Sequence, residues 1–183
     1  EPEPYLDNRR MYCPRGRVVG GSSSINGMIY IRGHAFDYDA WARHQGLQDW
    51  SYFNCLPYFK KAETRLKGGD KYRGNSGPLY VTTAPCTNPL YDTFIEAGRQ
   101  AGYPVTEDMN GYQQEGLGRM DMTVYKGRRW SAAQAFLRPA QKRGGVELKA
   151  KTLVTRILFE GRRAVGVEFS HGGNLQSARA TRE

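Results

Sequence analysis

The sequence predicts a mixed α/β or α+β fold in two parts, and three observations support this prediction. Helix start and stop signals dominate residues 37–145, whereas β-rich runs separated by short turns dominate residues 146–180. These elements do not alternate strictly, as a purely parallel α/β sheet would require. The composition is that of a globular protein, with 39% hydrophobic and 25% charged residues in a chain of 183.

The first elements follow a polar opening segment. Residues 1–15 contain several prolines and predict an extended segment or loop. Asp37 predicts the N-cap of a helix running through Trp41. Ser51 predicts the cap of a second helix, which Pro57 should break or restart.

The middle of the chain predicts one strand and two further helices. Residues 77–83, Gly-Pro-Leu-Tyr-Val-Thr-Thr, have strand composition behind a turn signal. Asn88-Pro89 predicts a helix start and Gly102 its end, with apolar residues on one side between them. Capping-box spacing at residues 131–134 predicts another helix, limited by Pro139 and closed by the glycine pair at 144–145.

The last forty residues predict a β-meander. Four β-rich runs occupy residues 146–148, 152–160, 164–170 and 175–180. Glycine-containing turns of hairpin type separate the last three runs. We therefore expect a three-stranded antiparallel meander at the end of the chain.

The charge balance is basic but dispersed. There are 27 basic and 18 acidic residues, a net charge of +9, which permits nucleic acid, acidic membrane or phosphate-bearing partners. The densest basic group is Lys126, Arg128 and Arg129, and no long basic block occurs. A solvated surface is therefore the favoured interpretation. No apolar run approaches the roughly 18–20 residues of a membrane-spanning helix, although peripheral attachment stays open.

Cysteine and histidine residues give little support to a metal site or a disulfide framework. All are scattered and none forms a C-x-x-C pair: Cys13, Cys55, Cys86, His34, His44 and His171. This pattern fits a reducing compartment and predicts no metal.

The most unusual stretch is the glycine- and serine-rich segment 16–33. Gly20-Gly21 followed by Ser22 to Ser24 supplies backbone N–H groups, small side chains and hydroxyls, which suit a phosphate-rich cofactor. Asn26-Gly27 adds an amide and bare backbone for a second polar part of the ligand. Composition alone favours ligand binding only slightly over a glycine-rich surface loop. A complete G-x-G-x-x-G fingerprint is absent.

This stretch carries a family resemblance. The pattern Gly16-Arg17-x-Val19-Gly20-Gly21-Ser22-Ser23-x-Ile25-Asn26, with Tyr30, Gly33 and Asp39 at fixed intervals, resembles the first signature of the glucose–methanol–choline (GMC) flavin oxidoreductases. Segments 38–41, 55–60, 72–79, 101–111, 114–116, 129–133 and 159–168 are similar to choline-oxidising members in particular. The resemblance covers essentially all 183 residues.

The resemblance implies a fold and a cofactor. It implies part of a GMC oxidoreductase, with an FAD/NAD(P)-binding-type domain that contains the β-meander and part of an α+β substrate domain. Residues 1–37 and 143–183 would belong to the FAD-binding domain, and residues 38–142 to the cover and substrate domain. The residues implied to bind FAD are Gly20, Gly21, Ser22, Asn26, Gly27, Ile29 and Val154, the last through its backbone near the adenine. Some relatives bind flavin covalently through a histidine at the position of Ile25, so the resemblance implies non-covalent FAD here.

The resemblance also implies an activity whose catalytic residues lie elsewhere. We expect FAD-dependent oxidation of a primary alcohol by hydride transfer, with choline converted to betaine aldehyde in glycine betaine biosynthesis. The FAD fingerprint should precede this chain, and the catalytic histidine should follow it. No histidine here is assigned that role, and the chain alone is expected to be an inactive internal piece. Its implied electron acceptor is membrane-bound, on the cytoplasmic side of a bacterial inner membrane or at the mitochondrial inner membrane.

Two alternatives stay open. A related GMC enzyme could act on aliphatic or aromatic alcohols, and a more distant alternative is a non-catalytic basic module that binds phosphate or nucleic acid. Trp41, Trp50 and Trp130 could form a cation–π cage for a quaternary ammonium group, but packing is the favoured interpretation for each.

Overall fold

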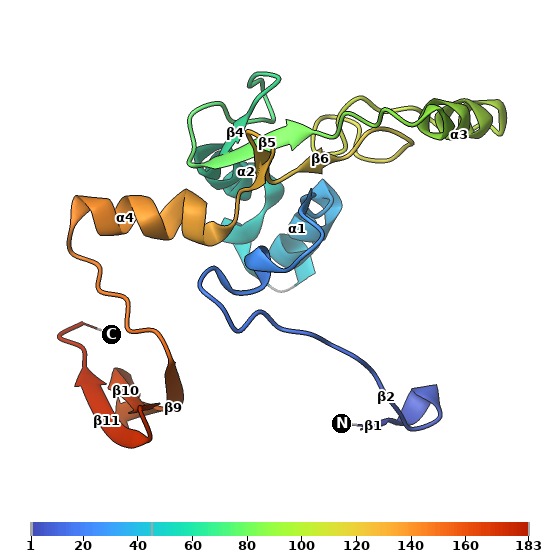
Figure 1. Ribbon diagram of the computed structural model, residues 1–183. Helices are drawn as coiled ribbons and strands as arrows, with labels where there is room; N and C mark the ends of the chain where they lie inside the picture. Colours follow the sequence, from blue (N-terminus) through green and yellow to red (C-terminus); the bar gives the residue numbers. More distant parts are fainter. Residues whose placement is uncertain (1, 45, 183) are drawn as a thin grey trace. The chain divides into compact units, whose positions relative to one another are not determined.

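The computed structural model describes residues 2–44 and 46–182, which form two compact units (Figure 1). The first unit spans Glu1–Arg143 and the second spans Gly144–Glu183. The first contains helices and short strands, and the second contains a β-meander. The predicted mixed fold class is therefore confirmed.

The chain opens with a small hairpin. Strands β1 (Pro2–Glu3) and β2 (Arg9–Arg10) pair antiparallel around the 3₁₀ turn η1 (Pro4–Leu6). Residues 11–17, which follow, have no regular structure. The expected extended or loop character therefore describes most of this segment, and a single short hairpin interrupts it.

A four-stranded sheet lies at the centre of the first unit, where Figure 1 labels β4, β5 and β6. The order of its strands is β3-β6-β5-β4. Its strands are β3 (Ile29–Tyr30), β4 (Glu63–Arg65), β5 (Leu79–Thr83) and β6 (Asp121–Met122). Only β4 and β5 are parallel. β5 confirms the strand predicted in residues 77–83, and its Val81 is fully buried. The two- and three-residue strands were not predicted, because so short a run shows no alternating pattern.

A tight hairpin follows the sheet. Strands β7 (Val124–Tyr125) and β8 (Arg128–Arg129) pair antiparallel. Both turn residues have positive φ, 49° at Lys126 and 71° at Gly127, as a two-residue hairpin turn requires.

Two helices follow the glycine-rich stretch, and each corrects one detail of the prediction. Helix α1 (Ala35–His44) has Asp37 in its first turn rather than at its N-cap. The Asp37 carboxylate instead accepts the His34 N–H (2.9 Å), which is the other half of a capping arrangement. Helix α2 (Tyr52–Ala62) begins after the predicted cap Ser51, whose hydroxyl accepts the Asn54 N–H.

Pro57 does not break α2, as the sequence predicted it would. The helix continues from Tyr52 to Ala62 with Pro57 inside it. The ring of Phe59, beyond the proline, packs edge-on against Tyr38 of α1 with centroids 5.6 Å apart. We infer that tertiary packing outweighs the cost of one missing hydrogen bond.

The predicted ends of the third helix are confirmed. Helix α3 (Pro89–Gln100) starts where the Asn88 side chain accepts the Leu90 N–H (3.0 Å). Gly102, with φ of 86°, lies just beyond its end. The expected apolar side remains partly uncovered, since Leu90 and Phe94 are 70% and 66% exposed.

The last helix of this unit begins after β8 with the π-helical turn η4 (Ala133–Leu137), and α4 (Arg138–Arg143) continues it. Pro139 lies inside this continuous helix, so the predicted limit at Pro139 was wrong. The Arg138 N–H donates to the Ala133 carbonyl, five residues back, and this wider turn accommodates a proline that donates nothing. Gly144 and Gly145, both with φ of 81°, end the helix as predicted.

The second unit confirms the predicted meander. Strands β9 (Thr152–Glu160), β10 (Arg163–His171) and β11 (Asn174–Arg179) form an antiparallel sheet in the order β11-β10-β9. Val165 and Phe169 of the central strand are its buried apolar residues. The β-rich run at residues 146–148 has no regular structure and pairs with none of the three strands, in agreement with a meander of three strands.

Candidate functional site

The glycine-rich stretch folds into a compact loop held by its own backbone. Gly20 and Gly21 have φ values of 95° and 56°, which glycine adopts without strain, and they lead into the 3₁₀ turn η2 (Gly21–Ser24). The Gly21 N–H donates to the Val18 carbonyl (2.8 Å). The Ser22 carbonyl accepts the N–H groups of Ile25 (3.1 Å) and Asn26 (2.9 Å). The loop is therefore an ordered structure rather than an unstructured surface segment.

The three serine hydroxyls shape this loop. Ser24 Oγ donates to the Val19 carbonyl (2.9 Å). Ser23 Oγ donates to the Gly20 carbonyl and accepts the Ala132 N–H (2.9 Å), so it joins the loop to the first turn of the following helix. Ser22 Oγ accepts the Gly16 N–H (3.1 Å), which leaves its own O–H able to donate elsewhere.

Arg129 clamps the loop from a position far along the chain. Its Nη1 atom donates to the carbonyls of Ser23 (3.2 Å) and Asn26 (2.8 Å) and to Asn26 Oδ1 (2.8 Å). Sequence reasoning missed this role, since it grouped Arg129 with dispersed surface charges. The available signal was that Arg129 begins a segment similar to the same family as the loop.

The loop presents donors and open space on its exposed side. Asn26 Oδ1 is occupied by Met28 N–H and Arg129, whereas Asn26 Nδ2 and the Gly27 N–H have no acceptor among residues 2–44 and 46–182. A Cβ placed on Gly27 would meet nothing within 4 Å. Ile29 is 47% exposed beside these groups. Two free donors, bare backbone and an apolar side chain form a surface that fits a polar cofactor with a flat ring system.

The predicted cofactor residues therefore fall into two groups. Six of them lie in or next to this one loop: Gly20, Gly21, Ser22, Asn26, Gly27 and Ile29. Val154 lies in β9 of the second unit, opposite Phe169, with its side chain 53% exposed. Because β9 is at the edge of its sheet, its outer backbone groups have no strand partner in that sheet and could contact a ligand. The binding roles of both groups stay predictions.

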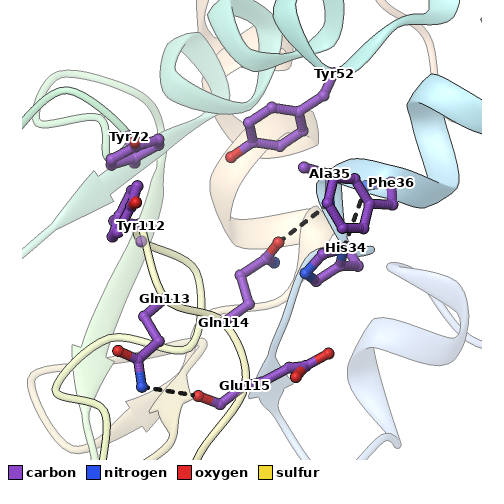
Figure 2. Close-up of a pocket in the computed structure, with 10 residues that line it drawn as sticks. His34, Ala35, Phe36, Tyr52, Tyr72, Tyr112, Gln113, Gln114 and Glu115 are labelled. Carbon is purple, nitrogen blue, oxygen red and sulfur yellow. Dashed lines mark hydrogen bonds between the residues drawn. The ribbon is translucent and has the colours of Figure 1, made fainter.

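A separate open pocket of about 490 Å³ lies where α1, α2 and residues 111–115 meet (Figure 2). Aromatic side chains line it, and the rings of Tyr72 and Tyr112 lie 6.3 Å apart. Gln114 closes one side by accepting the Ala35 N–H (3.2 Å), and Glu115 supplies a carboxylate. Aromatic faces with a carboxylate could bind an organic cation. The pocket contains none of the predicted site residues.

The tryptophans lie in two aromatic groups. Trp41 and Trp50 contact each other with ring centroids 6.4 Å apart. Trp130 stacks edge-on against Tyr80 and Tyr125 and donates Nε1–H to the Pro78 carbonyl (2.8 Å). The favoured packing interpretation therefore describes Trp130, and the three residues do not share one cage.

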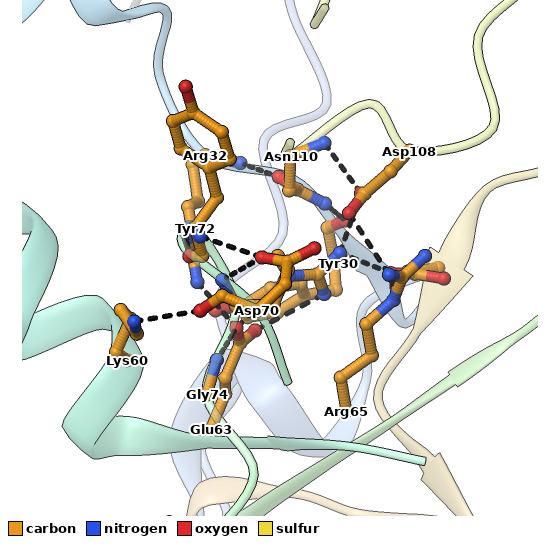
Figure 3. A network of polar contacts seen from close by, with 12 residues as sticks. Tyr30, Arg32, Lys60, Glu63, Arg65, Asp70, Tyr72, Gly74, Asp108 and Asn110 are labelled. Atoms are coloured by element: carbon orange, nitrogen blue, oxygen red, sulfur yellow. Dashed lines mark hydrogen bonds and ion pairs between the residues drawn. The ribbon is translucent and has the colours of Figure 1, made fainter. Parts of the chain in front are cut away.

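A buried charge network, which the sequence did not predict, lies beside β3 (Figure 3). Three arginines and three carboxylates balance within it: Arg32, Arg65, Arg73, Glu63, Asp108 and Asp121. The fully buried Arg73 contacts Glu63 (3.0 Å), Asp108 (2.6 Å) and Asp121 (2.8 Å). Burial lowers the pKa of Arg73, but the hydrogen bonds and charge of Glu63 outweigh it and raise the pKa above its usual value. The solvated-surface interpretation was thus wrong for Arg32 and Arg73.

Two further features bear on the kind of site. Among the described residues, no three His, Cys, Asp or Glu side chains are grouped so that they could hold a metal ion. None of the described helices has the length and apolar character needed to cross a membrane.

Comparison with known proteins defines the class of protein. A sequence model of the GMC oxidoreductase family matches residues 4–183, and the chain therefore belongs to this family. Two relatives with more specific names are similar to the whole chain. The chain is 57% identical to the oxygen-dependent choline dehydrogenase of Burkholderia multivorans, over 100% of this chain and 33% of that protein. It is 54% identical to the mitochondrial choline dehydrogenase of Mus musculus, over 100% of this chain and 30% of that protein. The chain spans about a third of the length of these relatives.

Solved structures show the same fold. Pyridoxine 4-oxidase from Mesorbium loti superposes with a TM-score of 0.83 at 32% identity, over 90% of this chain and 33% of that one. An FAD-dependent oxidoreductase from Chaetomium thermophilum has a TM-score of 0.89 at 27% identity, over 98% of this chain and 34% of that one. A fungal aryl-alcohol oxidase, at 23% identity and a TM-score of 0.84, shares the fold.

Proposed function

We propose that the full-length protein is an FAD-dependent choline dehydrogenase that oxidises choline to betaine aldehyde and onward to glycine betaine. The observation that carries this proposal is the identity of 54–57% over the whole chain to proteins named choline dehydrogenase. The solved relatives with other names are 32% identical or less. The choline relatives are thus the better guide to the substrate.

The clamped loop is the proposed contact with FAD. When bound, FAD accepts a hydride from the alcohol carbon. Asn26 Nδ2 and the Gly27 N–H would donate to polar cofactor atoms, and Ile29 would contact an apolar surface of the cofactor. Gly20 and Gly21 let the loop turn so that these groups share one side. Ile25 offers no nucleophilic nitrogen, so we propose that FAD is held without a covalent bond.

The remaining parts are assigned on the same basis. We propose that residues 1–37 and 143–183 belong to the FAD-binding domain, with the backbone at Val154 near the adenine, and that residues 38–142 belong to the cover and substrate domain. The break between compact units at Arg143 lies next to this second boundary. We assign the base that removes the hydroxyl proton to a histidine outside this chain.

The electron acceptor has two candidates. A membrane-bound acceptor would place the enzyme peripherally at a membrane, and the mitochondrial name of the mouse relative is compatible with this. The bacterial relatives are named oxygen-dependent, which favours oxygen as the second candidate. Oxygen consumption during choline turnover by the purified full-length protein separates the two.

The choice of substrate is tested with a matched pair of alcohols. Choline and its neutral isostere, in which a tert-butyl group replaces trimethylammonium, have nearly the same shape and differ in charge. We expect kcat/KM to be at least about tenfold higher for choline if the site recognises the cation. Equal values, or a preference for aliphatic or aromatic alcohols, would favour a different GMC alcohol dehydrogenase.

A further inference from the structure

One buried amide binds the end of strand β3, beside the candidate cofactor loop. Asn110 is 1% exposed and lies in a loop about eighty residues after β3. Its Oδ1 atom accepts the Arg32 N–H (2.7 Å), and its Nδ2 atom donates to the Tyr30 carbonyl (3.1 Å). The carbonyl of one strand residue and the N–H two residues later point to the same side. The Asn110 side chain therefore pairs with the strand as a peptide group would.

Asn110 is itself held in place by the buried charge network. Its backbone N–H donates to Asp108 Oδ1 (2.9 Å), and Arg73 binds that same oxygen (2.6 Å). Arg73 also binds Glu63 Oε1 (3.0 Å), which the Arg32 guanidinium contacts at 2.6 Å. Since Arg32 is also the residue whose backbone Asn110 pairs with, these contacts form a closed ring (Figure 3).

The ring is directly connected to the cofactor loop. Tyr30 ends β3, which begins two residues after Gly27. The other end of the loop is fixed separately, by Arg129 on Asn26 and by Ser23 on Ala132. Between these anchors lie Gly27, Met28 and Ile29, and Met28 has φ of 65°, a conformation that a non-glycine residue adopts only when its neighbours hold it.

We propose that Asn110 is a positioning residue for the flavin. Its hydrogen bonds to Tyr30 and Arg32 fix the position of β3, and through β3 they fix the positions of Gly27 and Ile29 relative to the cofactor. This inference rests on the proposed function. Asn110 makes no contact with the candidate site, yet its loss would weaken cofactor binding by more than the loss of stability alone explains. The charge network supplies the rigidity, because each member is paired and none can move without leaving a buried charge unmatched.

The test uses the purified full-length holoprotein and two substitutions. Asn110→Ala removes both contacts to the strand. Asn110→Asp has nearly the same shape and keeps an acceptor for the Arg32 N–H, but its carboxylate cannot donate to the Tyr30 carbonyl. The matched control is Val81→Ala, which opens a cavity at a fully buried site in β5. The Val81 side chain is apolar and forms no hydrogen bond to the loop or to Asn110. The flavin dissociation constant, the visible circular dichroism of bound flavin, and the unfolding temperature are measured for each.

We expect the flavin dissociation constant to rise by about tenfold in Asn110→Ala and by at least as much in Asn110→Asp, where a buried carboxylate oxygen would face the Tyr30 carbonyl. The flavin dichroism should change in both variants. Val81→Ala should lower the unfolding temperature at least as much while its dissociation constant and dichroism stay at the wild-type values. If Asn110→Ala does not fold, the comparison of Asn110→Asp with Val81→Ala decides the matter alone.

Two results would overturn the inference. One is an Asn110→Asp protein that is less stable but binds flavin with wild-type affinity and dichroism. The other is a Val81→Ala protein that loses flavin in proportion to stability, as the Asn110 variants do. A wild-type protein that binds no flavin would instead refute the proposed function itself, so the two failures are distinguishable.

Discussion

The fold does not require a glycine at position 27, whereas the proposed cofactor contact does, and Gly27→Leu tests this difference. Gly27 has an ordinary φ, it is exposed, and a Cβ placed on it meets no atom within 4 Å. The free energy of unfolding should therefore change by only about 0.5 kcal/mol, as for other surface substitutions. If the cofactor lies against this bare backbone, the leucine side chain must displace it. Overpacking of this kind costs about 1–3 kcal/mol, which weakens flavin binding by about 5- to 150-fold.

The matched control is Gly20→Ala in the same loop. Gly20 has φ of 95°, and an added Cβ would clash with Ser24 Oγ, which binds the Val19 carbonyl, and would lie 3.2 Å from Ala133 Cβ. The left-handed backbone alone costs a non-glycine residue about 1–2 kcal/mol, so this variant should lose stability and flavin together. Thermal unfolding of the apoprotein and fluorescence titration with FAD measure the two effects. Wild-type flavin affinity in Gly27→Leu would refute the placement of the loop against the cofactor.

Three further predictions concern the same region and its supports. Arg129→Lys keeps the charge but loses the donor geometry that binds Ser23 and Asn26, so flavin affinity should fall by about tenfold in a titration with little change in unfolding temperature; unchanged affinity would contradict the clamp. Acid precipitation of the holoprotein should release all flavin into the supernatant because Ile25 cannot form a covalent bond, and fluorescence that stays with the pellet would contradict this. Burial raises the pKa of Asp70, but the N–H groups of Tyr72 (2.6 Å) and Arg73 (2.9 Å) outweigh it and lower the pKa below its usual value. The stabilisation that results is present above the pKa of the unfolded state, near 4, and is lost as pH falls through the lower pKa of the folded state. Acid unfolding curves should therefore show a smaller loss of stability between neutral pH and pH 3 for Asp70→Asn than for the wild type. An unchanged loss would contradict the stabilising role of the ionised Asp70.

Local signals predicted the element ends that depend on local chemistry. Ser51 and Asn88 cap their helices with their own side chains, and the glycine turns of the meander need positive φ whatever surrounds them. Pro57 and Pro139 misled the prediction because packing and a π-helical turn, which no local pattern reports, accommodate them.

The candidate site shows the same division. The loop composition favoured ligand binding only slightly, and the family resemblance then implied Gly20, Gly21 and Asn26 as cofactor residues, which stay predictions. The residues that hold the loop, Arg129 and Asn110, lie 103 and about 80 residues away and have no local signature. The buried charges could not be predicted either, because a charged residue is expected at the surface unless its partners are known.

An anaerobic titration of the full-length holoprotein with choline tests the central claim most directly. The account predicts that the flavin absorption bands bleach as choline is added and return when oxygen or another acceptor is admitted, since hydride from the alcohol carbon would reduce the bound FAD. A protein that contains no flavin, or whose flavin stays oxidised with choline while another alcohol reduces it, would contradict the assignment.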